Sequence, residues 1–349
     1  MNKSNTLVSA FLILGLLIPP FVFSYSDSRE TAIQDALDVL KGEPALARTV
    51  RAEEESVSSP FFKRHKIIGE TLDEIELEVT LKIGYIAGDT TYDFDNHVSE
   101  LMFPFDNWMG GANVNAGFKK FSLNIDFWAP IDKEANSKMT DKDWFSATLI
   151  SSTESRADMD AVIAEGYVRY DFYEGIAPRN IEPLALLASD GIKLGALIGY
   201  KYERFDYDLY DLYDRILGVM SYQDEHIGTY KIQYYFPYVG LAADILRKEF
   251  KFSMNLKYSP LPTAKDVDNH LLRSLTFYGD YDKPKYAFMF GIEGIWGLMH
   301  NWNFGLGLDG TFARIDGITW DETRNPAWDK DQFTKLTQVL FWSELKYRF

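Results

Sequence analysis

The chain has 349 residues, of which 15% are aromatic and none is cysteine, and its formal net charge is -16. Without cysteine, disulfides, thiol nucleophiles and thiolate metal sites are excluded. The acidic balance argues against nucleic acid as a partner, because binding phosphates needs a basic surface, and it would attract cationic peptides. The mean hydropathy of -0.22 is too low for a bundle of membrane helices. A transmembrane β-barrel fits both the aromatic content and the mean hydropathy, because it faces lipid with every second residue and carries aromatic girdles.

The first 71 residues differ in composition from the rest and are predicted to precede the folded domain. Lys3, an apolar stretch at residues 7–18 and a cleavage position at Ser24 predict a signal peptide over residues 1–24. Residues 25–71 are predicted to be a polar periplasmic leader, partly disordered or carrying one short helix around Leu37. Residues 72–349 are predicted to form the barrel.

From about residue 72, apolar and polar side chains alternate, as they do from Ile75 to Tyr85 and from Phe252 to Tyr258. Such alternation predicts strands with one apolar and one polar face. Ten strands are predicted, at residues 74–88, 97–116, 119–130, 160–173, 190–206, 228–246, 248–261, 271–298, 301–315 and 332–349. Most exceed the about 9 to 11 residues that a tilted strand needs to cross a bilayer. The expected fold is therefore all-β, a ten-stranded antiparallel transmembrane barrel that ends on the aromatic Phe349.

An even number of strands places both ends of the barrel domain on one side of the membrane. If those ends are periplasmic, the loops at residues 89–96, 131–159, 207–227, 262–270 and 316–331 are extracellular. The predicted location is the cell outer membrane, with these loops and any site in them facing outward.

Two of the predicted outer loops carry acidic clusters: Asp141 and Asp143 in one, and Asp266, Asp268 and His270 in the other. Residues at i and i+2 of extended backbone point the same way. His270 would accept a proton from water while Asp268 orients its ring. Asp141 and Asp143 would contact that water from the opposite side. One of them would keep a proton to donate, because close carboxylates resist ionising together. This predicts hydrolysis without a covalent intermediate.

Other interpretations of these clusters stay open. The acids could be solvated loop residues or sites for cations that bridge lipids. A metal site built from His226, His270 and a carboxylate is a further alternative, although we predict neither a metal nor a bound cofactor. Competing acid and histidine groups are Asp224-Glu225-His226 and His97 with Asp93 and Asp95, whereas His65 and His300 are expected to be structural.

The two acidic clusters resemble the motifs of a known family. The segment Asp141-Lys142-Asp143-Trp144 resembles the Asp-x-Asp-Trp motif of the omptins, and Asp266-Val267-Asp268-Asn269-His270 resembles their Asp-x-Asp-x-His motif. Similar segments cover about residues 72–349, and the leader lies outside them. The resemblance implies a ten-stranded outer-membrane aspartyl endopeptidase that cleaves peptides or proteins beside basic residues and needs lipopolysaccharide for activity.

The resemblance also assigns roles. It makes Asp141 and Asp143 the carboxylate pair, Asp268 and His270 the water-activating dyad, and Asp266 an acidic wall of a pocket for a basic side chain. Omptins place a second pocket acid where this chain has Tyr92, which leaves the preference for Arg or Lys less firmly implied than proteolysis.

The lipid A site of the family is partly retained, and a second function class stays open. Tyr200 and Arg204 match the family pattern, whereas Glu203 is displaced by one position and Gln233 stands where an arginine is expected. Arg204 would bind a lipid phosphate or extend to the membrane interface. The alternative to a protease is a catalytically inactive barrel that serves as an adhesin or surface receptor.

Overall fold

The structure is a computed structural model and describes residues 75–94, 98–175, 191–299, 301–323 and 330–349. The chain divides into two compact units, Met1–Ser56 and Val57–Phe349, and every described residue belongs to the second unit. The predicted signal peptide and leader, together with His65, His97 and His300, lie outside the described residues. No helix in the described ranges is long and apolar enough to cross a membrane.

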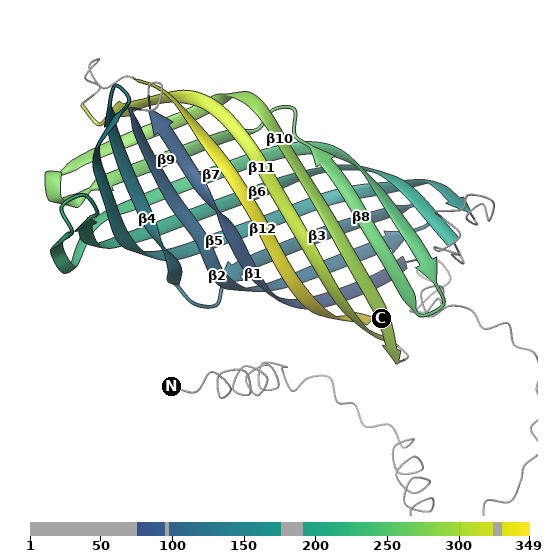
Figure 1. Ribbon diagram of the computed structural model, residues 1–349. Helices are drawn as coiled ribbons and strands as arrows, with labels where there is room; N and C mark the ends of the chain where they lie inside the picture. The colour runs from purple at the N-terminus through teal and green to yellow at the C-terminus, as the bar shows by residue number, and fades with distance from the viewer. Residues whose placement is uncertain (1–74, 95–97, 176–190, 300, 324–329) are drawn as a thin grey trace, which may run out of the picture. The chain divides into compact units, whose positions relative to one another are not determined.

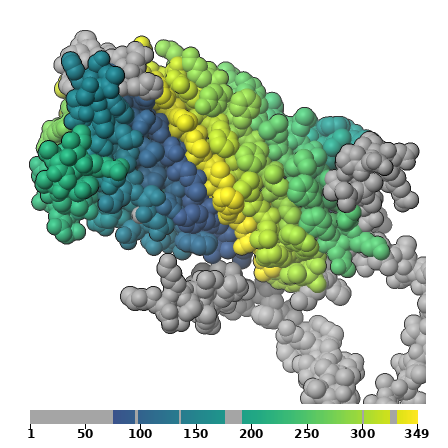
Figure 2. Space-filling model, viewed as in Figure 1, coloured from purple at the N-terminus to yellow at the C-terminus, as the bar shows by residue number. Residues whose placement is uncertain are grey.

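Twelve antiparallel strands form one sheet that closes on itself, because β12 pairs with β1 (Figures 1 and 2). The strands are β1 (Ile75–Phe94), β2 (Ser99–Phe118), β3 (Phe121–Pro130), β4 (Glu134–Phe145), β5 (Thr148–Gly175), β6 (Gly191–Asp214), β7 (Val219–Arg247), β8 (Phe250–Tyr258), β9 (Thr263–His270), β10 (Leu275–Met299), β11 (Trp302–Asp321) and β12 (Lys330–Arg348).

The twelve strands occupy ten positions around the barrel. β3 and β4 both lie between β2 and β5, one after the other, and β8 and β9 share the position between β7 and β10 in the same way. The predicted ten-stranded antiparallel barrel is therefore confirmed, with two of its positions divided into two segments each.

The predicted outer loops are wrong in extent, because most of their residues continue the strands. β4 and the start of β5 lie in the segment predicted as a loop at 131–159, and β9 fills the one predicted at 262–270. These polar segments pair with neighbours on both sides, which satisfies their backbone groups whatever the polarity of the side chains. At Gly88 the strand continues with φ of +128°, a conformation that glycine adopts without strain, so β1 runs on to Phe94.

The two faces of the barrel differ in chemistry. Apolar side chains are exposed on the outside, as expected of a lipid-facing band; they include Ile125, Ile198, Leu241, Leu256 and Leu306. The interior holds buried ion pairs and a polar cavity of about 240 Å³. Charged side chains line this cavity, among them Lys82, Asp126, Glu165, Lys257 and Glu344.

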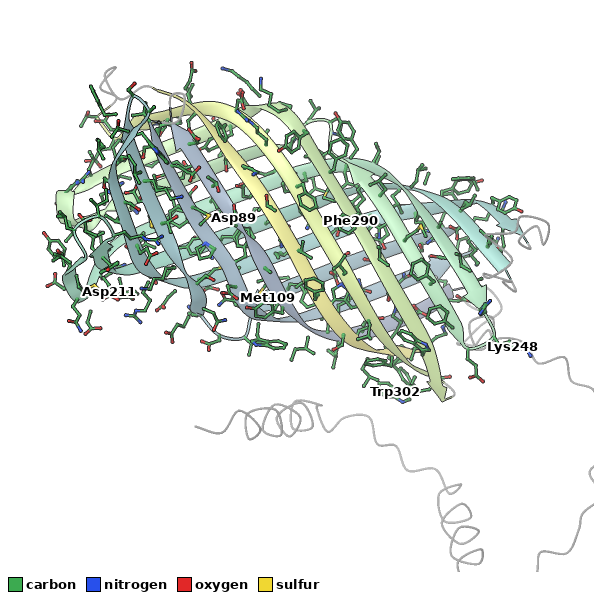
Figure 3. All side chains as sticks on the ribbon, in the orientation of Figure 1. Asp89, Met109, Asp211, Lys248, Phe290 and Trp302 are labelled. Atoms are coloured by element: carbon green, nitrogen blue, oxygen red, sulfur yellow. The ribbon has the colours of Figure 1, made fainter. Side chains whose placement is uncertain are left out.

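The two ends of the barrel can be followed in Figure 3, where Asp211 lies near one end and Lys248 and Trp302 near the other. We call the Asp211 end the mouth. β4 and β9 both lie toward the mouth (Figure 1). Between the mouth and the polar cavity, buried aromatic rings fill the interior: Tyr92, Phe103, Phe105, Phe205, Tyr207 and Tyr230.

Candidate active site

β9 carries a histidine and an aspartate that contact each other at the mouth. The alternation of β9 turns Asp266, Asp268 and His270 toward the interior, while Val267 and Asn269 take the other face. His270 Nε2 lies 3.0 Å from Asp268 Oδ2, and the ring of His270 packs edge-on against Phe277. Asp268 is buried and His270 is partly exposed. This arrangement orients the imidazole and leaves it open to small molecules at the mouth.

Asp141 and Asp143 lie on β4, on the other side of the barrel mouth from β9. Asp141 pairs with Leu101 of β2 and Thr153 of β5, and the buried side chain of Leu101 marks this face as the interior one. Asp141 Oδ1 is buried and has no hydrogen-bond partner among the described residues. Asp141 lies close enough to Asp268 and His270 for each of them to shift its pKa. The structure thus brings the two predicted clusters together across the mouth.

Burial and neighbouring charges place the protonation of this site near neutral pH. Burial, followed by the negative charges of Asp143 and Asp268, raises the pKa of Asp141 to about 7, against the opposing effects of His270 and Arg273. The hydrogen bond with Asp268 raises the pKa of His270 above its ordinary 6.5, against the effect of burial. An acid with a pKa of about 7 across the mouth from a histidine is suited to exchange protons with a substrate at physiological pH.

Tyr92 joins this site from a strand that does not pair with β9. Its hydroxyl donates a hydrogen bond to Asp268 Oδ2 at 2.5 Å, the same oxygen that faces His270. The side chain is only 2% exposed, and its ring stacks on that of Tyr230 with centroids 5.3 Å apart. The outer loop predicted at this position is therefore wrong, because Tyr92 is a buried residue of β1 whose side chain crosses the barrel interior.

Asp266 lies deeper than the dyad and is surrounded by protein donors. The hydroxyls of Tyr230 and Tyr281 donate to its Oδ2 at 3.1 and 2.7 Å, and the backbone of Gly279 also hydrogen-bonds to the carboxylate. Gln332 in turn hydrogen-bonds to the Tyr281 hydroxyl. Burial is the largest cause that raises the pKa of Asp266 to about 7.

Tyr230 and Tyr281 are not among the site residues expected from the sequence. A signal for Tyr230 is present there, since residues 230, 232, 234, 236 and 238 alternate on one face of β7 and all are buried. Tyr281 has no such signal, because β10 has register shifts on both sides of Pro284 that break the alternation.

Tyr200 and Arg204 lie on the outer face of β6, away from the dyad. Tyr200 is 47% exposed, and Arg204 Nε forms an ion pair with Asp206 Oδ2 at 2.6 Å. Gln233, which pairs with Arg204, donates a hydrogen bond to the Tyr202 hydroxyl at 2.8 Å. The two residues thus have the exposure that a lipid contact requires.

His226 belongs to a different part of the mouth. Its ring stacks on Tyr210 with centroids 5.1 Å apart, and its Nε2 lies 3.5 Å from Asp208 Oδ1. Across the described ranges, no group of three or more His, Asp or Glu residues is arranged to hold a metal ion. Of the other competing residues, Asp93 is buried, and Asp95 lies outside the described ranges.

A family model matches this chain, and one solved structure agrees with its fold. The Omptin family profile matches residues 74–323. The crystal structure of outer membrane protease OmpT from Escherichia coli is similar with a TM-score of 0.63 and 14% identity, over 78% of this chain and 97% of that chain. The translocator domain of autotransporter NalP from Neisseria meningitidis gives a TM-score of 0.31 and 9% identity, over 93% of this chain and 95% of that chain. No curated protein matches in sequence.

Proposed function

The chain belongs to the omptin family of outer-membrane proteases, and we propose that it is an aspartyl-type endopeptidase whose His270 activates a water molecule. The observation that supports this most is the contact between His270 Nε2 and Asp268 Oδ2, placed across the mouth from Asp141. A base, the group that orients it and a proton donor are the parts that hydrolysis by an activated water needs.

The contact with Asp268 supports a division of roles between the two ring nitrogens of His270. When Nε2 carries the proton and donates it to Asp268, Nδ1 is left to accept a proton from water. The carboxylate of Asp268 then stabilises the imidazolium that forms. The resulting hydroxide attacks the carbonyl carbon of the peptide bond, and no covalent bond between enzyme and substrate is formed.

Asp141 supplies the proton in this proposal. With a pKa of about 7 it holds a proton in a large fraction of molecules at neutral pH. It can donate that proton to the carbonyl oxygen or to the leaving amine, on the side of the substrate opposite His270. Asp143 lies two residues along the same strand, and its negative charge helps to keep Asp141 protonated.

The mouth faces the cell exterior in this proposal, and the substrates are peptides or proteins. Lipopolysaccharide is the proposed lipid partner, supported by the exposure of Tyr200 and by the position of Arg204 on the outer face of β6. Because Arg204 is paired with Asp206, a lipid phosphate would have to compete with that carboxylate for the guanidinium.

The test is cleavage of a quenched fluorescent peptide library by the refolded full chain, with and without lipopolysaccharide. We expect the wild type to cleave and the double variant Asp141→Asn/Asp143→Asn to lose at least about 100-fold in kcat/KM. If the wild type cleaves no peptide in any lipid, the chain is an inactive barrel of the adhesin or receptor kind. Equal cleavage by the double variant would exclude the two carboxylates from the mechanism.

A further inference from the structure

We propose that this enzyme cleaves next to uncharged residues rather than basic ones, because Tyr92 and two further tyrosines occupy the pocket in which a basic side chain would bind. The inference rests on the proposed peptidase function and names the substrate class of that same site. The family resemblance suggests the opposite class, with Asp266 as the acid that attracts Arg or Lys.

Most of the acceptor capacity of Asp266 is already used by the protein. A carboxylate offers about four lone-pair sites. Two are taken by the hydroxyls of Tyr230 and Tyr281, and the backbone of Gly279 takes another. Gly279 itself leaves no room, since a Cβ there would lie 2.2 Å from Asp266 Oδ1. A guanidinium pairs with a carboxylate through two parallel hydrogen bonds, so it would have to displace at least one of these donors from Asp266.

The space above Asp266 is also filled. Phe103 stacks on Tyr230 with ring centroids 3.9 Å apart, and Tyr92 stacks on Tyr230 from β1. Tyr92, Tyr230 and Tyr281 are each at most 2% exposed, and Asp266 is 6% exposed. A side chain as long as Arg or Lys would reach Asp266 only by breaking this stack.

The charge balance also disfavours a cation at this position. Moving a cation out of water costs several kcal/mol, which only a close and well-paired anion repays. Burial raises the pKa of Asp266 to about 7, so in about half of the molecules at that pH a cation would first have to displace a proton from this carboxyl. Burial raises the pKa of the Tyr92 phenol well above its ordinary value, so this group stays uncharged too.

Tyr92 is the residue that determines this specificity. The resemblance places a second pocket acid at its position. The phenol of Tyr92 instead donates a hydrogen bond to Asp268 and carries no negative charge. An uncharged side chain of the substrate would rest above the buried aromatic layer, beside His270 and Phe277, without needing a counter-ion.

The inference is tested with pairs of fluorogenic peptides that differ only at the residue before the cut. Arg is compared with citrulline, which has nearly the same shape without the charge, and Lys is compared with norleucine. We expect the refolded wild type to cleave the uncharged member of each pair at least as fast, in kcat/KM, as the charged one. A pocket that binds the charge would favour Arg by at least about 30-fold.

A preference of the wild type for Arg over citrulline of more than about threefold would overturn the inference and leave the peptidase function intact. No cleavage of any peptide would overturn both.

The variant Tyr92→Glu should raise the ratio of kcat/KM for the Arg peptide to that for the citrulline peptide by about 10-fold or more. The variant Tyr92→Gln, which matches it in size without charge, should leave the ratio near the wild-type value. Because each ratio is measured within one variant, a general loss of activity does not affect it. Equal ratios in the two variants would contradict the role of Tyr92.

Discussion

The Tyr92 hydroxyl donates a 2.5 Å hydrogen bond to Asp268 across the interior of the barrel, although the two residues lie 176 positions apart in the chain and on strands that do not pair. Asp268 Oδ2 therefore has two partners, the phenol of Tyr92 and the imidazole of His270. This connection makes Tyr92 a positioning residue for the proposed water-activating dyad.

The variant Tyr92→Phe keeps the ring in the aromatic layer and removes only this hydrogen bond. We expect kcat/KM to fall by about 10-fold, since a hydrogen bond to a charged group contributes about 1.5 to 3 kcal/mol. The acidic limb of the pH profile should move to higher pH, because Asp268 without the Tyr92 donor stabilises the imidazolium of His270 more strongly. The matched control is Tyr207→Phe, which removes a buried hydroxyl bonded to the Pro104 carbonyl in the same layer. An identical loss in both variants would reduce the role of Tyr92 to packing.

His270→Ala is expected to lower kcat/KM by about 100-fold to 10,000-fold, the usual contribution of a general base. The control is His226→Ala, which removes a histidine from the same end of the barrel that contacts Tyr210 and Asp208. Steady-state cleavage of one peptide by the two refolded variants provides the comparison. Similar losses in both would mean that the base had been assigned wrongly.

The pH dependence of kcat/KM should be bell-shaped, with its alkaline limb set by Asp141 near pH 7. His270 acts as a base only when neutral, and its pKa is raised above 6.5, so activity should rise as the pH passes through that raised value. Asp141 donates a proton only below its pKa of about 7, so activity should fall above it. Because the two groups interact, the apparent pKa values of the two limbs belong to the pair and not to either residue alone. In the Asp141→Asn variant the residual activity should lose its alkaline limb, and an unchanged limb would point to another proton donor.

Asp141 should also make stability depend on pH. Its pKa is raised in the folded state from 3.8 to about 7, so the folded chain binds more protons than the unfolded chain between these values. The free energy of unfolding therefore falls as pH rises through this window. We expect Asp141→Asn to raise Tm relative to wild type at pH 8 more than at pH 4, measured by thermal unfolding in the same detergent. An equal difference at both values would argue against a buried carboxyl at this position.

A buried ion pair in the interior gives a prediction independent of the site. Lys201 Nζ lies 2.6 Å from Glu203 Oε1 and 2.7 Å from Thr311 Oγ1, and Glu203 has no exposed surface. Lys201→Met should destabilise the barrel by about 3 to 5 kcal/mol, because it removes the cation that pairs with a buried carboxylate. Urea unfolding in lipid vesicles measures the loss. Lys133→Met, which removes the exposed partner of Asp160, should have little effect.

The alternation of the sequence determined most of the fold. Strands such as those around Leu81, Leu241 and Leu256 are predictable because a lipid-facing band requires apolar residues at every second position. The same alternation, applied to positions i and i+2, groups Asp141 with Asp143 and Asp268 with His270. It does not give the length of the strands beyond the lipid-facing band, because pairing on both sides allows polar segments such as β4 and β9 to continue as strand.

Only the tertiary structure decided what surrounds the acids. The family resemblance implies that Asp266 is open to a basic side chain, but it accepts hydrogen bonds from Tyr230 and Tyr281, which come from strands β7 and β10. Tyr92 likewise reaches Asp268 across the interior. Such contacts join residues far apart in the chain and depend on how the barrel closes, and no local pattern encodes them. The sequence by itself therefore determined the barrel and the proposed catalytic set, whereas closure of the barrel decided which of its acids remain open to a substrate.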